Sequence, residues 1–250
     1  MKSVYSREQI VGTSWCDSSA RLSWTGCFGL FQDLAGEHAQ EMGCGISWLM
    51  ERGLFWVTSK TLFRVYRRPE IFSGVTVETW PEPPGRLRCN RDYRLTAGGE
   101  LLAEGKTEFV LVDLKNGGMR PPTEAFPQAY EFFSRERVCP EPFHRFPDTG
   151  GWELFSETEV GSTDIDLGGH MNNVAYVRML ERQFSTAEWK RMEPREMELH
   201  YRSSCYEGER LRILRRESEA DTEFRVERES DGKLILLALL RRSAAGDGSQ

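Results

Sequence analysis

Residues 28–42 read FGLFQDLAGEHAQEM, and their apolar positions recur every three or four residues, as on one face of a helix. Gly43 follows and predicts the helix end, because glycine is favoured just past a helix C-terminus. Four runs rich in β-branched and aromatic residues come next, divided by turns such as residues 97–99. The expected strands are Leu54–Tyr66, Val75–Trp80, Arg88–Leu95 and Leu101–Asp113. The first half therefore predicts a long helix followed by antiparallel strands.

The second half repeats this plan, so a weak internal repeat is the main feature of the sequence. A short strand, Leu154–Val160, precedes a glycine-containing loop and an expected helix from Asn172 to Lys190. Four further strands are expected at Glu196–Arg202, Arg210–Arg216, Glu223–Glu229 and Leu234–Arg241. Residues 234–240 are all apolar, as in a central strand buried on both faces. The predicted fold class is α+β, with two similar units in tandem.

A proline-rich segment, residues 117–151, separates the two halves. Proline cannot donate to a sheet ladder, so we expect a strap here rather than a strand. The expected boundaries are 1–116 for the first unit, 152–243 for the second, and 244–250 for a disordered tail. Because sheet edges need a partner, we expect one sheet to continue across both halves.

The composition excludes several classes of protein. Hydrophobic residues make up 39% of the chain and charged residues 29%, as in ordinary globular proteins. The net charge of −6 argues against nucleic acid as a partner, because nucleic-acid binding needs a basic surface. No apolar run approaches the roughly 18 residues that cross a bilayer, so we expect no membrane insertion. Residues 1–8 lack the apolar core of a secretion signal, which predicts a cytoplasmic location. The cysteines form no CxxC pair, and neither metal nor cofactor is expected.

Polar residues concentrate just before the second expected helix. Side chains two apart in an extended segment share a side, so Asp166 and His170 can face one site across Gly168. Asn172 or Asn173 suits the N-cap of the helix. A helix N-terminus offers N–H donors and partial positive charge to a developing oxyanion. A carboxylate and an imidazole beside it can activate and orient water.

A simpler interpretation of the same residues stays open, because a loop Asp next to a His also serves in caps and turns without catalysis. Residues 22–27, before the first expected helix, hold neither an acid nor a histidine, so we expect only the second half to be catalytic. His38 lies on the apolar stripe of the first helix and is expected to be a hydrogen-bonded core residue.

The sequence resembles the acyl-acyl-carrier-protein (acyl-ACP) thioesterases of plants and bacteria over most of its length. The similar stretches are Leu30–Asp33, Glu37–Ala39, Gly53–Val57, Val75–Pro81, Asp164–Asp166 and His170–Tyr176. The resemblance implies a double hotdog fold, in which two long helices are each wrapped by an antiparallel sheet. It also implies hydrolysis of acyl-ACP thioesters in fatty acid biosynthesis, with an acyl tunnel chiefly in the first half. Acyl-CoA is a further candidate substrate.

The catalytic positions of that family carry over in part. The family motif has Asp, Asn and His at two-residue spacing; Asp166 and His170 match it, and Gly168 stands at the Asn position. Many members have a Glu–Cys pair on a later strand; Cys205 matches the cysteine, and Ser204 replaces the glutamate. Two polar groups expected to polarise the carbonyl or direct water are thus replaced.

Three accounts of the chemistry stay open. In the first, Asp166 and His170 handle the attacking water, helix N–H groups hold the oxyanion, and Ser204 positions the water. In the second, Cys205 is the nucleophile and His170 its base. In the third, the substitutions leave a weak enzyme or a non-catalytic acyl-thioester binding protein.

Aromatic residues of the first half are candidates for substrate contact. Trp48, Phe55 and Trp56 are expected to line the tunnel or the core, and Gly168 is expected at the substrate in the second half. The rival enzyme is a hotdog hydratase or dehydratase, which would abstract a proton beside the carbonyl. ACP is the expected partner, and a homodimer of such chains stays open.

Overall fold

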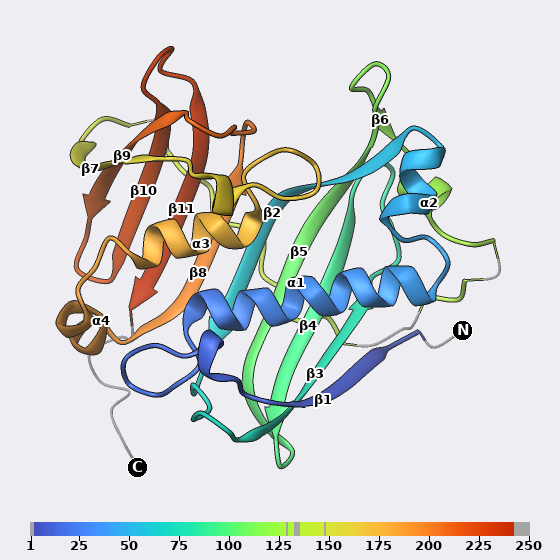
Figure 1. Ribbon diagram of the computed structural model, residues 1–250, viewed down its shortest axis with the longest axis horizontal. Coiled ribbons are helices and arrows are strands. Elements are labelled where there is room, and N and C mark those ends of the chain that lie inside the picture. The colour runs from blue at the N-terminus through green and yellow to red at the C-terminus, as the bar shows by residue number, and fades with distance from the viewer. Residues whose placement is uncertain (1–2, 129, 133–135, 148, 243–250) are drawn as a thin grey trace. The chain divides into compact units, whose positions relative to one another are not determined.

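The computed structural model describes residues 3–128, 130–132, 136–147 and 149–242 (Figure 1). The chain divides into a first unit that ends at Glu141 and a second that begins at Pro142, so the division falls inside the expected linker. The expected tail, 244–250, lies outside the described residues. Among the helices of the described residues, none is long and apolar enough to cross a membrane.

Helix α1 (Trp24–Glu41) lies across the strands of the first unit (Figure 1). Ser23 begins it, because its hydroxyl accepts a 2.9 Å hydrogen bond from the amide of Gly26. Gly43, at φ +74°, follows the last turn. The apolar face packs on the sheet, as in the stacked pair of Phe31 and Tyr93, whose ring centroids are 5.0 Å apart. The helix expected around residues 28–42 is confirmed.

The sheet of the first unit has the antiparallel order β1-β3-β4-β5-β2. Its strands are β1 (Tyr5–Ile10), β2 (Leu54–Val65), β3 (Gly74–Pro81), β4 (Cys89–Ala97) and β5 (Glu100–Asp113). The four expected strands are confirmed to within a few residues. β1 was not expected, because its sequence, YSREQI, is mostly polar and lacks an apolar run. Polar and charged residues are common in strands at the edge of a sheet.

Three short elements complete the first unit, together with the 3-10 helix η1 (Thr13–Trp15). They are α2 (Ile46–Glu51), β6 (Met119–Arg120) and the 3-10 helix η2 (Pro122–Ala125). β6 pairs with the end of β5, so the expected absence of a sheet ladder from residues 117–151 is wrong at its start. The prolines there begin just after β6, which lets two residues pair before the chain leaves the ladder.

The second unit has the antiparallel order β8-β11-β10-β9-β7. Its strands are β7 (Glu153–Glu159), β8 (Pro194–Tyr201), β9 (Arg210–Glu217), β10 (Asp221–Arg228) and β11 (Leu234–Arg242). β11 lies between β8 and β10 and buries every residue from 235 to 240, as its apolar run predicted. Its helices are η3 (Ser162–Asp164), α3 (Asn173–Glu181) and α4 (Thr186–Met192). Continuity of the two sheets across the halves stays a prediction.

The single helix expected over residues 172–190 is wrong, because α3 and α4 are separate. Between them Phe184 turns into the core, where its ring centroid lies 5.9 Å from that of Phe224. Ser185 then begins α4 with a capping box, in which its hydroxyl and amide pair with the amide and carboxylate of Glu188. The apolar stripe predicted one continuous helix, but the packing of Phe184 and the cap at Ser185 divide the segment into two helices.

Candidate functional site

A loop in the second unit, between η3 and α3, holds the two candidate catalytic residues. An antiparallel bridge between Ile165 and Met171 closes the loop. Inside the bridge, the amide of Asp166 donates to the carbonyl of His170 at 2.9 Å, and the amide of Gly169 donates to the carbonyl of Asp166 at 3.0 Å. Gly169 has φ +74°, a conformation that favours glycine. The structure therefore brings Asp166 and His170 together through the backbone of a tight turn.

The side chains of these two residues have different surroundings. Asp166 is exposed, and its Oδ1 accepts a 2.8 Å hydrogen bond from the amide of Gly168. His170 is half-buried, and its ring centroid lies 5.2 Å from that of Tyr206, with an angle of 51° between the planes. Leu167, at the tip of the loop, is 89% exposed. Gly168 thus supports the Asp166 carboxylate with its backbone, although it lacks the side chain of the expected Asn.

Helix α3 begins directly after this loop. Asn172 is its N-cap, as predicted, and its side-chain oxygen accepts a 2.8 Å hydrogen bond from the amide of Val174. The amide of Asn172 donates to the carbonyl of Asp164 at 2.7 Å, and Asn173 is the first helical residue. The carbonyl of Asn172 accepts from the amide of Ala175 at 2.9 Å. The amides of Val174 and Ala175 are therefore engaged by the N-cap residue.

Cys205 and Ser204 join the loop from the turn after β8. The carbonyl of Cys205 accepts a 2.9 Å hydrogen bond from the amide of Met171, and the carbonyl of Ser204 accepts one of 3.1 Å from Arg228. Ser204 is exposed, whereas Cys205 is fully buried. Burial raises the pKa of the Cys205 thiol to about 11, although a hydrogen bond with the Tyr176 hydroxyl offsets part of this rise. Because the thiolate is the nucleophile, this setting argues against the Cys205 route.

The first unit contains a loop with the same backbone hydrogen bonds. The amide of Asp17 donates to the carbonyl of Arg21 at 2.9 Å, and the amide of Ala20 donates to the carbonyl of Asp17 at 3.0 Å. The amide of Ser19 donates to the Asp17 carboxylate at 2.9 Å. Ala20 has φ +58°, so it adopts the left-handed conformation seen at Gly169. An isolated bridge closes this loop too, and α1 follows it. The internal repeat therefore extends to the site loop.

The side chains of the two loops differ in charge. Arg21 stands at the position of His170, and Arg68 donates to the carboxylate of Asp17. Burial would raise the pKa of Asp17, but hydrogen bonds from Ser19 and Arg68 outweigh it and hold that pKa below its ordinary value. The acid of the first loop is thus held by an arginine.

The sequence signal for this second loop is its spacing. Asp17 precedes the N-cap Ser23 by six residues, as Asp166 precedes the N-cap Asn172. The expectation that the region before the first helix has no acid is therefore wrong, because the equivalent loop begins before residues 22–27. This loop has an arginine, Arg21, at the position equivalent to that of His170, and a single catalytic copy stays a prediction.

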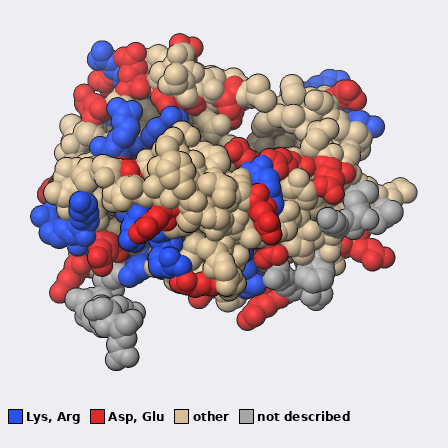
Figure 2. Space-filling view, turned by 60° about the horizontal axis from the view of Figure 1, so that its bottom comes forward, with Lys and Arg blue, Asp and Glu red and all other residues tan. Residues whose placement is uncertain are grey.

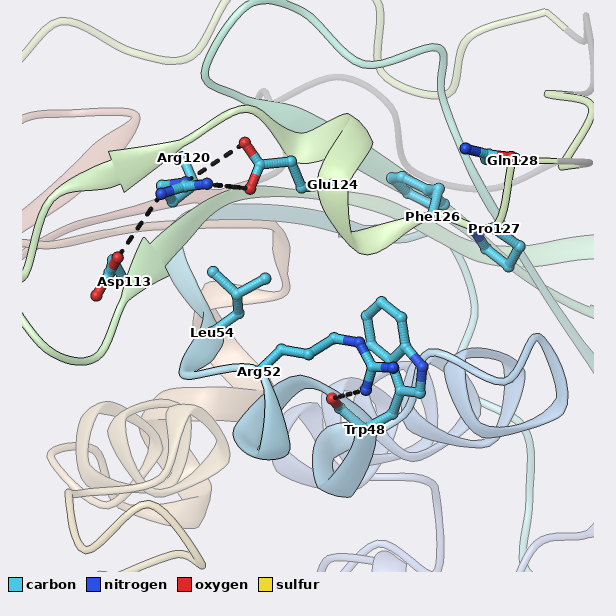
Figure 3. Close-up of a pocket in the computed structure, with 9 residues that line it drawn as sticks. All are labelled: Trp48, Arg52, Leu54, Asp113, Arg120, Glu124, Phe126, Pro127 and Gln128. Atoms are coloured by element: carbon cyan, nitrogen blue, oxygen red, sulfur yellow. Dashed lines mark hydrogen bonds and ion pairs between the residues drawn. The ribbon is translucent and has the colours of Figure 1, made fainter.

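A cavity of about 500 Å³ opens in the first unit between α2, η2 and the ends of β2 and β5 (Figure 3). Its lining combines four largely apolar side chains with one amide and four charged side chains. The apolar ones are Trp48, Leu54, Phe126 and Pro127, the amide is Gln128, and the charged ones are Arg52, Asp113, Arg120 and Glu124. Figure 3 places the Arg52 side chain over the Trp48 ring, with the guanidinium carbon 3.9 Å from the ring centroid. A pocket of this size and character can hold part of a small-molecule ligand.

The three aromatic candidates for substrate contact separate in the structure. Trp48 lines the cavity, and Trp56 packs beside it, with its ring centroid 6.1 Å from that of Phe126. Phe55 and Trp56 are neighbours on β2, so their side chains point to opposite faces of the strand. Neither Phe55 nor Trp56 is among the described residues that line this cavity.

The other three histidines lie outside the loop of Asp166 and His170. His38 is 1% exposed, and its Nδ1 lies 3.0 Å from a guanidinium nitrogen of Arg91, so the predicted core role is confirmed. His200 lies buried 2.6 Å from Glu198, and His144 lies 3.3 Å from Glu223. In the described part of the chain, no group of three or more His, Cys, Asp or Glu could hold a metal ion.

Basic and acidic side chains lie next to one another over the face drawn in Figure 2. Ion pairs such as Arg178 with Asp164, at 3.6 Å, and Arg210 with Glu159, at 3.7 Å, have this character. Exposed pairs contribute roughly 0–1 kcal/mol each, so they affect solubility and partner choice more than stability.

Family profiles match both halves of the chain. The profile described as acyl-ACP thioesterase N-terminal domain matches residues 2–125, and the one described as acyl-ACP thioesterase C-terminal domain matches residues 152–238. Curated relatives include oleoyl-acyl carrier protein thioesterase 2 of Arabidopsis thaliana, described as chloroplastic, which is 23% identical over 201 residues. That match covers 72% of this chain and 54% of the relative, so the chain spans about half the length of the curated relatives it matches.

Solved structures resemble the whole chain. An acyl-ACP thioesterase from Bacteroides thetaiotaomicron has a TM-score of 0.84 at 20% identity, covering 96% of this chain and 97% of its own. The 12:0-ACP thioesterase from Umbellularia californica has a TM-score of 0.76 at 19% identity, with the same coverage of both chains. At these identities the likeness concerns the fold, and the predicted double hotdog is confirmed.

Proposed function

The chain belongs to the acyl-ACP thioesterase family, and from that premise we propose that it hydrolyses acyl-ACP thioesters to a free fatty acid and the carrier thiol. The observation that carries the proposal is the loop of Asp166 and His170, which lies within the region matched by the C-terminal family profile. The turn holds both residues at the start of a helix, where water activation and oxyanion stabilisation can meet.

In the proposed reaction, water attacks the thioester carbonyl carbon. Asp166 is exposed and His170 half-buried, so both can hydrogen-bond to a water molecule and take up its proton. The carbonyl oxygen becomes an oxyanion near the N-terminus of α3, whose partial positive charge stabilises it. The C–S bond then breaks, and the departing thiolate receives the proton.

Ser204 and Cys205 have different places in this proposal. Ser204 is exposed on the turn that bonds to the loop, and we assign its hydroxyl to positioning the water. Cys205 contributes its carbonyl to the amide of Met171, and its buried thiol takes no part in the reaction.

The acyl chain is proposed to bind in the first unit. The apolar part of the cavity, with Trp48 and Phe126, supports this assignment, because alkyl chains are bound by apolar and aromatic walls. ACP is the proposed partner, and acyl-CoA is a second candidate substrate. A cytoplasmic location and a homodimer remain predictions, and light scattering would test the second.

The test is thiol release from acyl-ACP thioesters of chain lengths from C8 to C18, with wild type and His170→Ala side by side. Release by the wild type that collapses in the variant supports hydrolysis at this site. An enoyl or hydroxyacyl product would indicate a hydratase or dehydratase instead. Tight retention of acyl-ACP without thiol release would overturn hydrolysis and favour a binding protein.

A further inference from the structure

The ring of Tyr206 lies against the imidazole of His170. Their centroids are 5.2 Å apart and the planes are inclined by 51°. This separation is within the range of favourable aromatic pairs. Tyr206 is nevertheless 48% exposed, so its ring is not held there by burial in the core.

The turn that carries Tyr206 is fixed by an ionic network from β10. The amide of Tyr206 donates to Oε2 of Glu209 at 3.1 Å, and that oxygen lies 3.2 Å from Nε of Arg228. Arg228 also donates to the carbonyl of Ser204 at 3.1 Å and to the carboxylate of Asp231 at 3.2 Å. Arg228 thus connects Ser204 and Glu209, which flank Tyr206, to β10. The backbone that carries the Tyr206 ring is therefore held in place.

The imidazole of His170 has fewer contacts that orient it than the backbone of its loop has. Gly168 and Gly169 precede the histidine, and glycine allows the widest backbone freedom. Among the described residues, no hydrogen bond joins the imidazole nitrogens of His170 to another side chain. A catalytic base needs a group that orients it, and the contact present here is an aromatic one.

We propose that Tyr206 is a positioning residue for His170, whose ring limits the imidazole to the orientation used in the reaction. The role rests on the proposed hydrolysis, and it fits a chain in which Gly168 and Ser204 replace two polar groups of the site. Tyr206 acts through its ring rather than its hydroxyl, because the contact is between rings.

The contact is tested by NMR on the full chain, using the imidazole C–H signals of its four histidines. His170→Gln assigns the signal of His170. Tyr206→Ala removes the ring current and should shift that signal, whereas Tyr206→Phe should leave it nearly in place. Tyr66→Ala is the matched control, because Tyr66 is 42% exposed and bonds to Glu104 in the first unit.

The role is tested by kinetics on the same variants, after thermal unfolding has confirmed that each is folded. We expect Tyr206→Ala to lower kcat about tenfold with KM nearly unchanged, because a misplaced base slows the chemical step more than binding. Tyr206→Phe should restore kcat, and Tyr66→Ala should match the wild type.

Two results would overturn the inference: an unshifted His170 signal in Tyr206→Ala, or a folded Tyr206→Ala with the kcat of the wild type. Loss of activity in Tyr206→Phe would also overturn it, because the hydroxyl would then matter. If the wild type releases no thiol from any thioester, the proposed hydrolysis fails, while the NMR comparison still decides whether the ring holds the imidazole.

Discussion

The amide of Met171 donates a 2.9 Å hydrogen bond to the carbonyl of Cys205. This single bond joins the loop of Asp166 and His170 to the turn that carries Ser204 and Tyr206. The two segments are more than thirty residues apart in the sequence, with α3, α4 and β8 between them. The two segments of the site are therefore joined by a backbone hydrogen bond. Cys205 contributes its main-chain carbonyl oxygen, which any residue at this position would supply.

Asp166→Asn should abolish hydrolysis without unfolding the protein. The amide oxygen can still accept from Gly168, and the residue is exposed, so the turn is retained. Loss of general-base chemistry is worth about 10²–10⁴-fold in rate. Steady-state kinetics and thermal unfolding of the same preparation measure both effects. Turnover equal to that of the wild type would remove Asp166 from the mechanism.

Cys205→Ala should retain most of the activity and lose some stability. The thiol is buried against Tyr176, and its removal leaves a small cavity, for which we expect a cost of about 1–2 kcal/mol. The carbonyl that accepts from Met171 is unaffected by the substitution. Urea unfolding and thiol-release assays are the measurements. Complete inactivity in a stably folded variant would revive the nucleophilic route.

Alkylation provides an independent test of the same thiol. Its raised pKa leaves almost no thiolate at pH 8, so iodoacetamide should modify Cys205 slowly in the folded protein. Mass spectrometry of peptides from native and urea-unfolded protein compares the two rates. Rapid labelling in the native state, prevented by acyl-ACP, would show a reactive cysteine at the site.

Asp17→Asn should destabilise the protein at neutral pH and leave kcat unchanged. The pKa of Asp17 is lowered, so the carboxylate stabilises the fold above its ordinary pKa of 3.8, and this contribution disappears as the pH falls below that value. Because the pair with Arg68 is partly exposed, we expect only about 1 kcal/mol. Unfolding curves at pH 7 and about pH 3 should show a difference that is smaller in acid. A constant difference would mean that the ionised carboxylate is not the cause.

Asp92 should make stability fall as the pH rises toward neutrality. Burial, with the charge of Glu82 nearby, raises the pKa of this fully buried carboxyl to about 7. Its protonated form is favoured in the fold, so the stabilisation is complete below pH 3.8 and is lost as the pH rises through about 7. Asp92→Asn should flatten this dependence. Denaturation midpoints from pH 4 to 8 give the comparison, and parallel curves for both proteins would contradict the assignment.

Sequence patterns predicted the helices and strands that are determined by residues close to them in the chain. The helix around residues 28–42 has a continuous apolar face and a glycine at its end, and β11 contains an unbroken apolar run. The N-cap Asn172 was also predictable, because it depends on its neighbours in the chain.

The elements that were missed depend on distant contacts. The break before α4 results from the packing of Phe184 on Phe224, which no window of residues 172–190 contains. The ring of Tyr206 reaches His170 only because β8 brings the turn back to the loop. The burial of Cys205, which argues against the nucleophilic route, is likewise a property of the folded chain.

The paired loops of Asp17 and Asp166 have a consequence for how such a site can change. The bonds that the two turns share, apart from those to the aspartates themselves, join main-chain atoms. The geometry is thus nearly indifferent to the other side chains, so arginine and histidine can occupy equivalent positions without refolding. The same backbone conformation can therefore carry either a catalytic or a non-catalytic set of side chains. A few substitutions in the loop are enough to gain or lose reactivity, because the backbone is retained.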